Sequence, residues 1–282
     1  MANALSSSLA PGLRKRLVYL PLFLLLGLLA GGSIWAREGV DVGKNSAFSQ
    51  LVPADSVERS SLEQYAQMLD QAAEKKALAS KDHPQLRRLR DIANKIIPHA
   101  LSWNPRAANW QWEVNLIGSK QINAFCMPGG KIAFYTGILD QLKLNDDEVA
   151  MVMGHEIAHA LREHARERMG KSAATNIGAS LLTQLLGLGQ VGQTVTNYGA
   201  QLLTLQFSRD NESEADLVGM ELAARAGYDP RAGVTLWQKM SAANKGAPPQ
   251  WLSTHPSGTT RIGDIEANLP KVLPLYERIK TN

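Results

Sequence analysis

The sequence contains a single cysteine, Cys126, among its 282 residues. One cysteine cannot form an intramolecular disulfide, and it cannot build a cysteine-rich metal site. Aromatic residues make up only 6% of the chain, and the net charge is a mild +4. A nucleic-acid-binding surface needs Lys and Arg clustered with aromatic residues, and the sequence has no such cluster. We therefore expect no nucleic acid among the partners.

The composition fits a single globular domain with a small addition at the N-terminus. Hydrophobic residues make up 44% and charged residues 20% of a chain that is long enough to bury a sizeable core. The absence of a fixed-period repeat and of low-complexity tracts excludes a solenoid and a largely disordered protein. We expect a signal peptide or membrane anchor over residues 1–36, a polar linker over 37–59 and one folded domain over 60–282.

The N-terminal region has the pattern of a secretory signal. Arg14, Lys15 and Arg16 precede an uncharged segment, residues 17–36, in which a strongly apolar run is followed by small residues. Cleavage after Gly32 fits this pattern, yet the uncharged segment is also long enough to cross a bilayer, so a cleaved signal and a retained anchor both stay open. Both predict that the remaining chain lies in the periplasm of the cell envelope, because the basic residues stay inside.

The spacing of apolar and turn residues predicts a mostly helical chain with a few short strands. Helices are predicted from Ser60 and from Pro84, a strand over 110–119, and two short strands around a Pro-Gly-Gly turn over 122–137. The apolar, glycine-rich segment 172–206 predicts two packed helices, or an element that covers the substrate or touches a membrane.

A capping box marks the start of the helix that carries half of the histidines. Asn145 stands at the cap with Glu148 three residues later, and the acidic first turn suits the helix dipole. A helix is therefore predicted from Asp146 to about Met169.

Two of the histidines share one face of that helix. His155 and His159 are four residues apart, so they differ by about 40° around the helix axis and can bind one metal ion. Glu156 completes the pattern H-E-x-x-H of zinc hydrolases, in which zinc acidifies a water and the glutamate takes its proton. His164 should face the opposite side, as an exposed surface histidine. Buried histidines without partners would be costly, which favours a metal site over a chance spacing.

A catalytic zinc needs a third protein ligand. The metzincin pattern requires a histidine and a glycine where this sequence has Ala165 and Arg162, which excludes that pattern. A deformylase-like site would recruit Cys126, but it requires an aspartate where Ala158 stands. We therefore disfavour the deformylase-like site.

A second helix, with the sequence "NESEAD", offers the remaining candidates. Glu212 and Asp216 are four residues apart and share a face, whereas Glu214 points nearly opposite. We assign Glu212 as the third zinc ligand and Asp216 as the partner that holds the other ring nitrogen of a ligand histidine. Glu214 is expected to be a surface carboxylate.

Four segments of the sequence, taken in order, resemble one family. The segments are "NAFCMPGGKIAFYTGIL", "HEIAH", "SRDNESEAD" and "STHPSGTTRI". They are similar to the zinc metallopeptidases that include HtpX, the CAAX prenyl protease and the mitochondrial Oma-type protease, in particular to the periplasmic BepA and LoiP branch. The resemblance covers about residues 60–280. It implies an α+β, mostly helical zincin fold of the gluzincin type, with a small β-sheet beside the active-site helix.

The resemblance also implies roles for particular residues. His155, His159 and Glu212 would bind one Zn²⁺ per chain, and Glu156 would be the general base.

Two further segments take roles from the same resemblance. The strand that contains Asn123, Ala124 and Phe125 would be the edge on which a peptide substrate pairs. His255 would cap the zinc in a resting form, and Arg261 would be a catalytic residue that holds the oxyanion or the substrate.

These observations predict a zinc metalloendopeptidase that hydrolyses misfolded or unassembled cell-envelope proteins. At most one membrane span is predicted, so the intracellular-membrane substrates of HtpX and the prenyl protease are not carried over. The alternative is a zinc-stabilised periplasmic chaperone or outer-membrane-protein assembly factor, because the edge strand and segment 172–206 would bind unfolded chains equally well. A membrane-anchored scaffold with an incidental metal motif is a third hypothesis. Membrane contact is expected through 17–36 and possible through 172–206.

Overall fold

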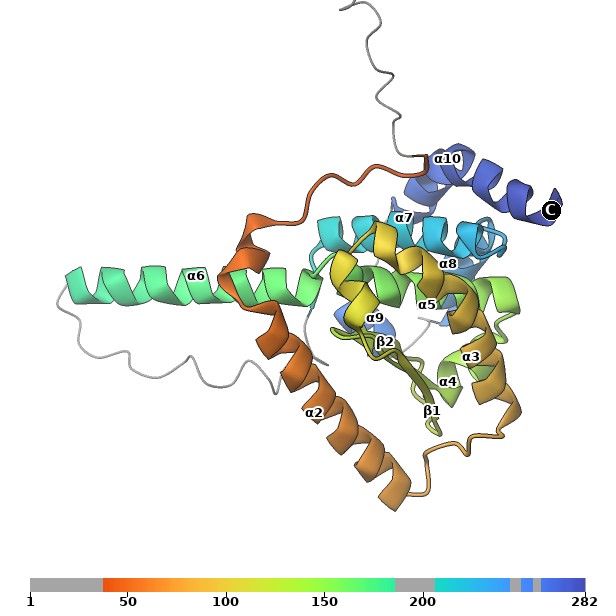
Figure 1. Ribbon diagram of the computed structural model, residues 1–282, viewed down its shortest axis with the longest axis horizontal. Helices are drawn as coiled ribbons and strands as arrows, with labels where there is room; N and C mark the ends of the chain where they lie inside the picture. Colours follow the sequence, from red (N-terminus) through yellow and green to blue (C-terminus); the bar gives the residue numbers. More distant parts are fainter. Residues whose placement is uncertain (1–37, 186–205, 244–249, 256–259, 282) are drawn as a thin grey trace, which may run out of the picture. The chain divides into compact units, whose positions relative to one another are not determined.

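The structure, a computed structural model, describes residues 38–185, 206–243, 250–255 and 260–281 (Figure 1). In chain order its elements are η1 (Ala47–Leu51), α2 (Ala54–Glu74), α3 (Pro84–Ile96), η2 (Ile97–Ser102), η3 (Pro105–Asn109), β1 (Glu113–Ile117), β2 (Ala124–Met127), β3 (Lys131–Tyr135), α4 (Thr136–Leu142), α5 (Asp146–Leu161), α6 (His164–Leu185), α7 (Arg209–Arg225), α8 (Ala232–Ala243), α9 (Gln250–Thr254) and α10 (Arg261–Thr281); those named η are 3₁₀-helices. These elements confirm the expected mostly helical α+β architecture with a small sheet.

Two predicted segments fall wholly or largely outside the described part of the chain. Residues 17–36 lie outside it, and so do all but the α6 portion and Gln206 of segment 172–206. Among the helices that are described, none combines the length and the apolar character needed to span a membrane.

The described sheet has three strands in the order β1-β3-β2. Strand β3 pairs in parallel with β1 and antiparallel with β2, which leaves β2 at one edge. The turn between β2 and β3 places Gly129 and Gly130 at φ angles of 87° and 80°, a region that glycine adopts without strain. Ile132 and Phe134 face the main core beneath α5, while Ala133 faces the smaller core against α2.

Helix α5 begins at the predicted capping box. The Asn145 side chain accepts from the Glu148 backbone N–H, and the Glu148 carboxylate accepts from the Asn145 N–H, both at 2.9 Å. The helix ends at Leu161, so the prediction of a continuous helix to about Met169 is wrong. Glu163 adopts a φ of 58°, a left-handed conformation that interrupts the helix before α6 begins.

Helices α5 and α7 pack in direct backbone contact (Figure 1). A Cβ atom added at Gly154 of α5 would lie only 2.5 Å from the Gly219 carbonyl oxygen of α7. A Cβ atom added at Gly219 would lie 2.5 Å from the backbone nitrogen of His155. The two glycines therefore allow the two helices to approach closely beside the first histidine of the H-E-x-x-H pattern.

The segment that was expected to be a linker packs against the helices in its described part. The Val40 N–H donates to the buried Glu221 carboxylate of α7 at 2.8 Å. Arg166 of α6 donates to the Val52 carbonyl at 2.7 Å. Helix α2 then begins at Ala54, six residues before the predicted start. Residues 38–53 are thus held by hydrogen bonds to two helices of the domain.

Gly154→Ala should destabilise the protein, because the added methyl group collides with backbone atoms that cannot rotate away. We expect a loss of roughly 1–3 kcal/mol in the free energy of unfolding, measured by urea denaturation. Gly263→Ala in α10 is the matched control, since a Cβ atom there meets no atom within 4 Å in the described part of the chain beyond its own turn of helix. That control should be neutral or slightly stabilising, because alanine favours the helix. Equal stability of the two variants would contradict the close crossing.

Candidate metal and active site

Four donor atoms from three parts of the chain meet at the N-terminal half of α7. They belong to His155 and His159 of α5, Glu212 of α7 and His255, which follows α9, and all four side chains are buried. The two Nε2 atoms of His155 and His159 are 3.0 Å apart. The Glu212 Oε1 atom lies 3.3 Å from His159 Nε2 and 3.0 Å from His255 Nδ1. The pattern predicted from the sequence is thus brought together in space.

The donor set fits a tetrahedral metal ion in spacing and chemistry. Ligand bonds of about 2.0–2.1 Å in a tetrahedron separate neighbouring donors by about 3.3 Å. Four of the six donor separations are 3.0–3.3 Å, and all lie within 4.8 Å. Burial lowers the pKa of His159 well below its usual value, which keeps the ring neutral. Burial alone would raise the pKa of the Glu212 carboxyl, but hydrogen bonds with His159 and His255 hold it below its usual value. Neutral histidine and ionised carboxylate are the forms that bind metal.

The remote ring nitrogen of His155 is held by Asp216. Its Nδ1 atom lies 2.9 Å from Asp216 Oδ1, as the spacing on α7 predicts. Arg261 donates to both oxygens of Asp216 and, at 2.7 Å, to Glu212 Oε2. Its guanidinium lies 3.7 Å from the centroid of the Trp237 ring. Burial would raise the pKa of Asp216, but the charge of Arg261 and the hydrogen bond with His155 hold it low.

This arrangement alters the role expected of Arg261. The side chain is buried, it is not among the residues that line the neighbouring pocket, and its N–H groups are directed at two carboxylates. It therefore fits a positioning residue for Glu212 and Asp216 better than a group that contacts the oxyanion or the substrate.

The remote ring nitrogen of His159 is held by His164, contrary to expectation. The two Nδ1 atoms lie 2.9 Å apart, and His164 is only 1% exposed. His164 Nε2 is 3.4 Å from Glu214 Oε2, and Glu214 also accepts from Arg162. The prediction of an exposed His164 is wrong, and Glu214, whose side chain is 21% exposed, is a partly buried carboxylate that is paired with Arg162. The break at Glu163 redirects the chain, so a residue expected on the far side of one long helix returns toward His159.

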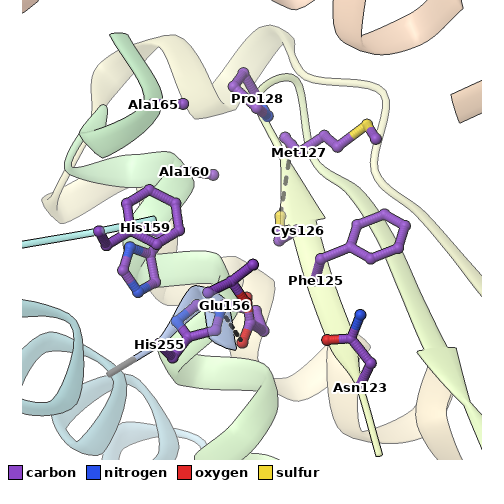
Figure 2. A pocket seen from close by; sticks show the side chains of 12 residues that line it. Asn123, Phe125, Cys126, Met127, Pro128, Glu156, His159, Ala160, Ala165 and His255 are labelled. Carbon is purple, nitrogen blue, oxygen red and sulfur yellow. Dashed lines mark hydrogen bonds and ion pairs between the residues drawn. The ribbon is translucent and has the colours of Figure 1, made fainter. Parts of the chain in front are cut away.

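Glu156, His159 and His255 line one pocket (Figure 2). The lining residues are Asn123, Phe125, Cys126, Met127, Pro128, Glu156, His159, Ala160, Ala165, Phe207, Thr254 and His255. Glu156 Oε1 accepts a hydrogen bond of 2.6 Å from the indole N–H of Trp251. Its carboxylate thus lies beside the donor cluster and at the wall of a cavity that is lined by both polar and apolar side chains.

Strand β2 forms the opposite wall of that pocket. Asn123 and Phe125 line it, whereas Ala124 is buried and its backbone N–H donates to Asn123 Oδ1 at 3.0 Å. Figure 2 shows the Phe125 ring turned away from Glu156 and His159, so this residue presents mainly backbone to the pocket. The sheet order leaves this side of β2 without a neighbouring strand in the described chain.

Two site residues were missed by the sequence analysis. The Phe207 ring packs on His159 with centroids 4.0 Å apart, and Trp251 contacts Glu156. Phe207 stands immediately before Ser208, the cap of α7, which is a position where an apolar residue often packs back onto its helix. Trp251 lies in the short helix α9, and nothing in its local sequence pointed to the acidic residue on α5.

The comparison with known families decides the membership. A model described as peptidase family M48 matches residues 82–269, which include all four donor residues. The chain belongs to this family. The expected resemblance and the zincin-like fold of the M48 domain are thereby confirmed.

Several curated relatives carry peptidase names. The mitochondrial metalloendopeptidase OMA1 of Arabidopsis thaliana is 41% identical over 171 residues, 60% of this chain and 34% of that protein. The protein of the same name from Schizosaccharomyces pombe is 32% identical over 250 residues, 86% of this chain and 71% of that protein. The β-barrel assembly-enhancing protease of Yersinia pestis is 30% identical over 193 residues, 65% of this chain and 38% of that protein. This M48 chain thus spans little more than a third of the length of two of these three relatives.

His164→Phe should weaken metal binding, because it retains the aromatic volume but removes the partner of His159 Nδ1. Loss of such a supporting hydrogen bond typically lowers metal affinity about 10–100-fold, measurable by competition for Zn²⁺ with a chelator. His99→Phe, a partly exposed histidine of η2, is the control and should bind Zn²⁺ as the parent protein does. Unchanged affinity in His164→Phe would show that the His159–His164 contact does not support the metal site.

Proposed function

We propose that this protein is a zinc-dependent metalloendopeptidase that hydrolyses peptide bonds in misfolded or unassembled proteins of the cell envelope. One observation carries the proposal: Glu156, two members of the donor cluster (His159 and His255) and the edge of β2 border the same pocket. Membership of peptidase family M48 supports the same reaction class.

The residues of the pocket suggest how the reaction proceeds. A substrate segment in extended conformation pairs with β2, which places a scissile carbonyl between this strand and α5. Zinc held by His155, His159 and Glu212 would supply Lewis acidity, which polarises the carbonyl and lowers the pKa of a water. A Glu156 carboxylate oxygen takes the proton as the water attacks and delivers it to the nitrogen of the leaving amine.

The pocket walls favour unfolded chains as substrates. Pairing with an edge strand requires an extended segment, and folded proteins keep most such segments within their own sheets. The side chains of Cys126, Pro128, Ala160, Ala165 and Phe207 give the cavity an apolar lining. Unfolded proteins expose the apolar side chains that such a lining accepts.

Two observations support a cell-envelope location. The basic and then apolar pattern of residues 14–36 resembles an export signal or anchor. One relative is named for enhancing β-barrel assembly, although the mitochondrial names of others leave the compartment a proposal.

A second function is favoured by the position of His255. With this side chain in the cluster, four protein donors surround the metal position, and such closed sets are typical of structural rather than catalytic zinc. The alternative is therefore a zinc-stabilised chaperone or assembly factor with little proteolysis. In the peptidase proposal, the same geometry is a resting form that opens when His255 withdraws.

Glu156→Gln should abolish cleavage while metal binding is retained, because the amide keeps the shape of the side chain but cannot accept the proton. We expect degradation of unfolded casein by the full-length chain to fall by roughly 10²–10⁴-fold. Glu266→Gln, an exposed glutamate of α10, is the matched control. Zinc content is measured in all three proteins, and cleavage by Glu156→Gln at the parent rate would rule out this base.

His255→Ala distinguishes the two proposed functions. If His255 caps the metal in a resting peptidase, its removal opens a coordination position and casein cleavage rises several-fold. A protein that gains no activity, and that still prevents aggregation of unfolded protein after zinc is removed by a chelator, would favour the chaperone.

A further inference from the structure

We propose that Trp251 is a positioning residue that holds the carboxylate of Glu156 in the closed form of the site. In this closed form His255 fills the donor cluster and Trp251 engages the general base, and both are released together when α9 withdraws. The inference rests on the proposed peptidase function and adds a second point of control to it.

The contact between Trp251 and Glu156 is short, direct and shielded from water. The indole N–H donates to Glu156 Oε1 at 2.6 Å, and the two residues are 0% and 2% exposed. A hydrogen bond to a buried carboxylate is among the stronger ones in proteins. The His255 Nε2 atom lies 3.6 Å from the same oxygen, so this oxygen is enclosed by two groups of the α9 region. An oxygen that already accepts a strong hydrogen bond is a weaker acceptor for the proton of an attacking water.

Trp251 and His255 form one unit. They are four residues apart, and the His255 N–H donates to the Trp251 carbonyl at 2.8 Å. Their rings stack with centroids 5.0 Å apart and an interplanar angle of 28°. A movement that takes His255 out of the donor cluster therefore carries Trp251 away from Glu156.

The attachment of α9 lies where the substrate is proposed to bind. The Trp251 backbone N–H donates to the Ile122 carbonyl at 3.1 Å, immediately before the edge strand. A substrate strand that pairs with β2 and extends past Asn123 would compete for this carbonyl. Substrate binding would thus weaken the hydrogen bond between Trp251 and Ile122. This hydrogen bond attaches the segment that carries both Trp251 and His255.

The first measurement tests the contact itself without reference to activity. Full-length protein labelled with ¹⁵N at its six tryptophans gives indole N–H resonances, and the one that disappears in Trp251→Phe is assigned to Trp251. Glu156→Gln should move this resonance upfield, because a charged acceptor is replaced by a neutral one. The Trp110 indole, which donates to Glu58 at 3.0 Å, is the internal reference and should not move. If the Trp251 resonance keeps its chemical shift in Glu156→Gln, the proposed hydrogen bond between Trp251 and Glu156 is overturned.

The second measurement tests the consequence. Trp251→Phe keeps an aromatic ring, although a smaller one, and removes the indole N–H donor, so the closed form loses a charge-assisted hydrogen bond and kcat/KM for casein should rise roughly ten-fold. Trp110→Phe is the matched control, since it removes an indole that also donates to a carboxylate, and it should leave kcat/KM unchanged. In combination with His255→Ala, the effects should be less than additive, because both substitutions release the same closed form.

The outcomes separate this inference from the proposed function. A lower kcat in Trp251→Phe, with KM and zinc content unchanged, would show that the indole assists the base and would overturn the holding role. Equal kcat/KM in Trp251→Phe and the parent would overturn it as well. If zinc-loaded parent protein and every variant leave casein intact, the peptidase proposal itself fails, whatever the indole resonance shows.

Discussion

The close crossing of α5 and α7 is the constraint on which the site depends. Helices packed through ordinary side chains lie about 8–10 Å apart, which separates the groups on their facing surfaces. Gly154 and Gly219 have no side chains, so the two helices approach more closely than that. His155 follows Gly154 in the chain, and its Nδ1 atom lies 2.9 Å from Asp216 Oδ1. Two missing methyl groups therefore decide whether residues some 60 positions apart can share one metal ion.

Each α5 histidine of the donor cluster is supported from behind by a charged network. Asp216 and Arg261 hold His155, while His164 and Glu214 stand behind His159. Buried charges are costly unless they are paired, so both networks are tolerated because opposite charges and hydrogen bonds compensate one another. Both networks hold the ring orientations of the two histidines.

The sequence predicts the parts of this site that depend on local spacing. The capping box at Asn145, the strands around the Pro-Gly-Gly turn and the shared face of Glu212 and Asp216 follow from short-range rules, and the structure agrees with them. The sequence does not predict the break at Glu163, because neither glycine nor proline marks it. Because Glu163 adopts a left-handed conformation, His164 is buried against His159 instead of exposed. The contact of Trp251 with Glu156 joins positions 95 residues apart, which no local pattern encodes.

The hydrogen bonds of residues 38–53 bear on what counts as one cooperative folding unit. The family match begins at residue 82, yet Arg162, next to the break in the helix, donates to the Gly43 carbonyl at 3.0 Å. Glu221 and Arg166 likewise bind backbone groups of that early segment. A fragment that contains only residues 82–269 would lack all of α2. In that fragment Arg162, Arg166 and Glu221 would lose their hydrogen bonds to residues 38–53. The evolutionary unit that a family profile recognises is thus shorter than the thermodynamic unit that keeps the histidines in place.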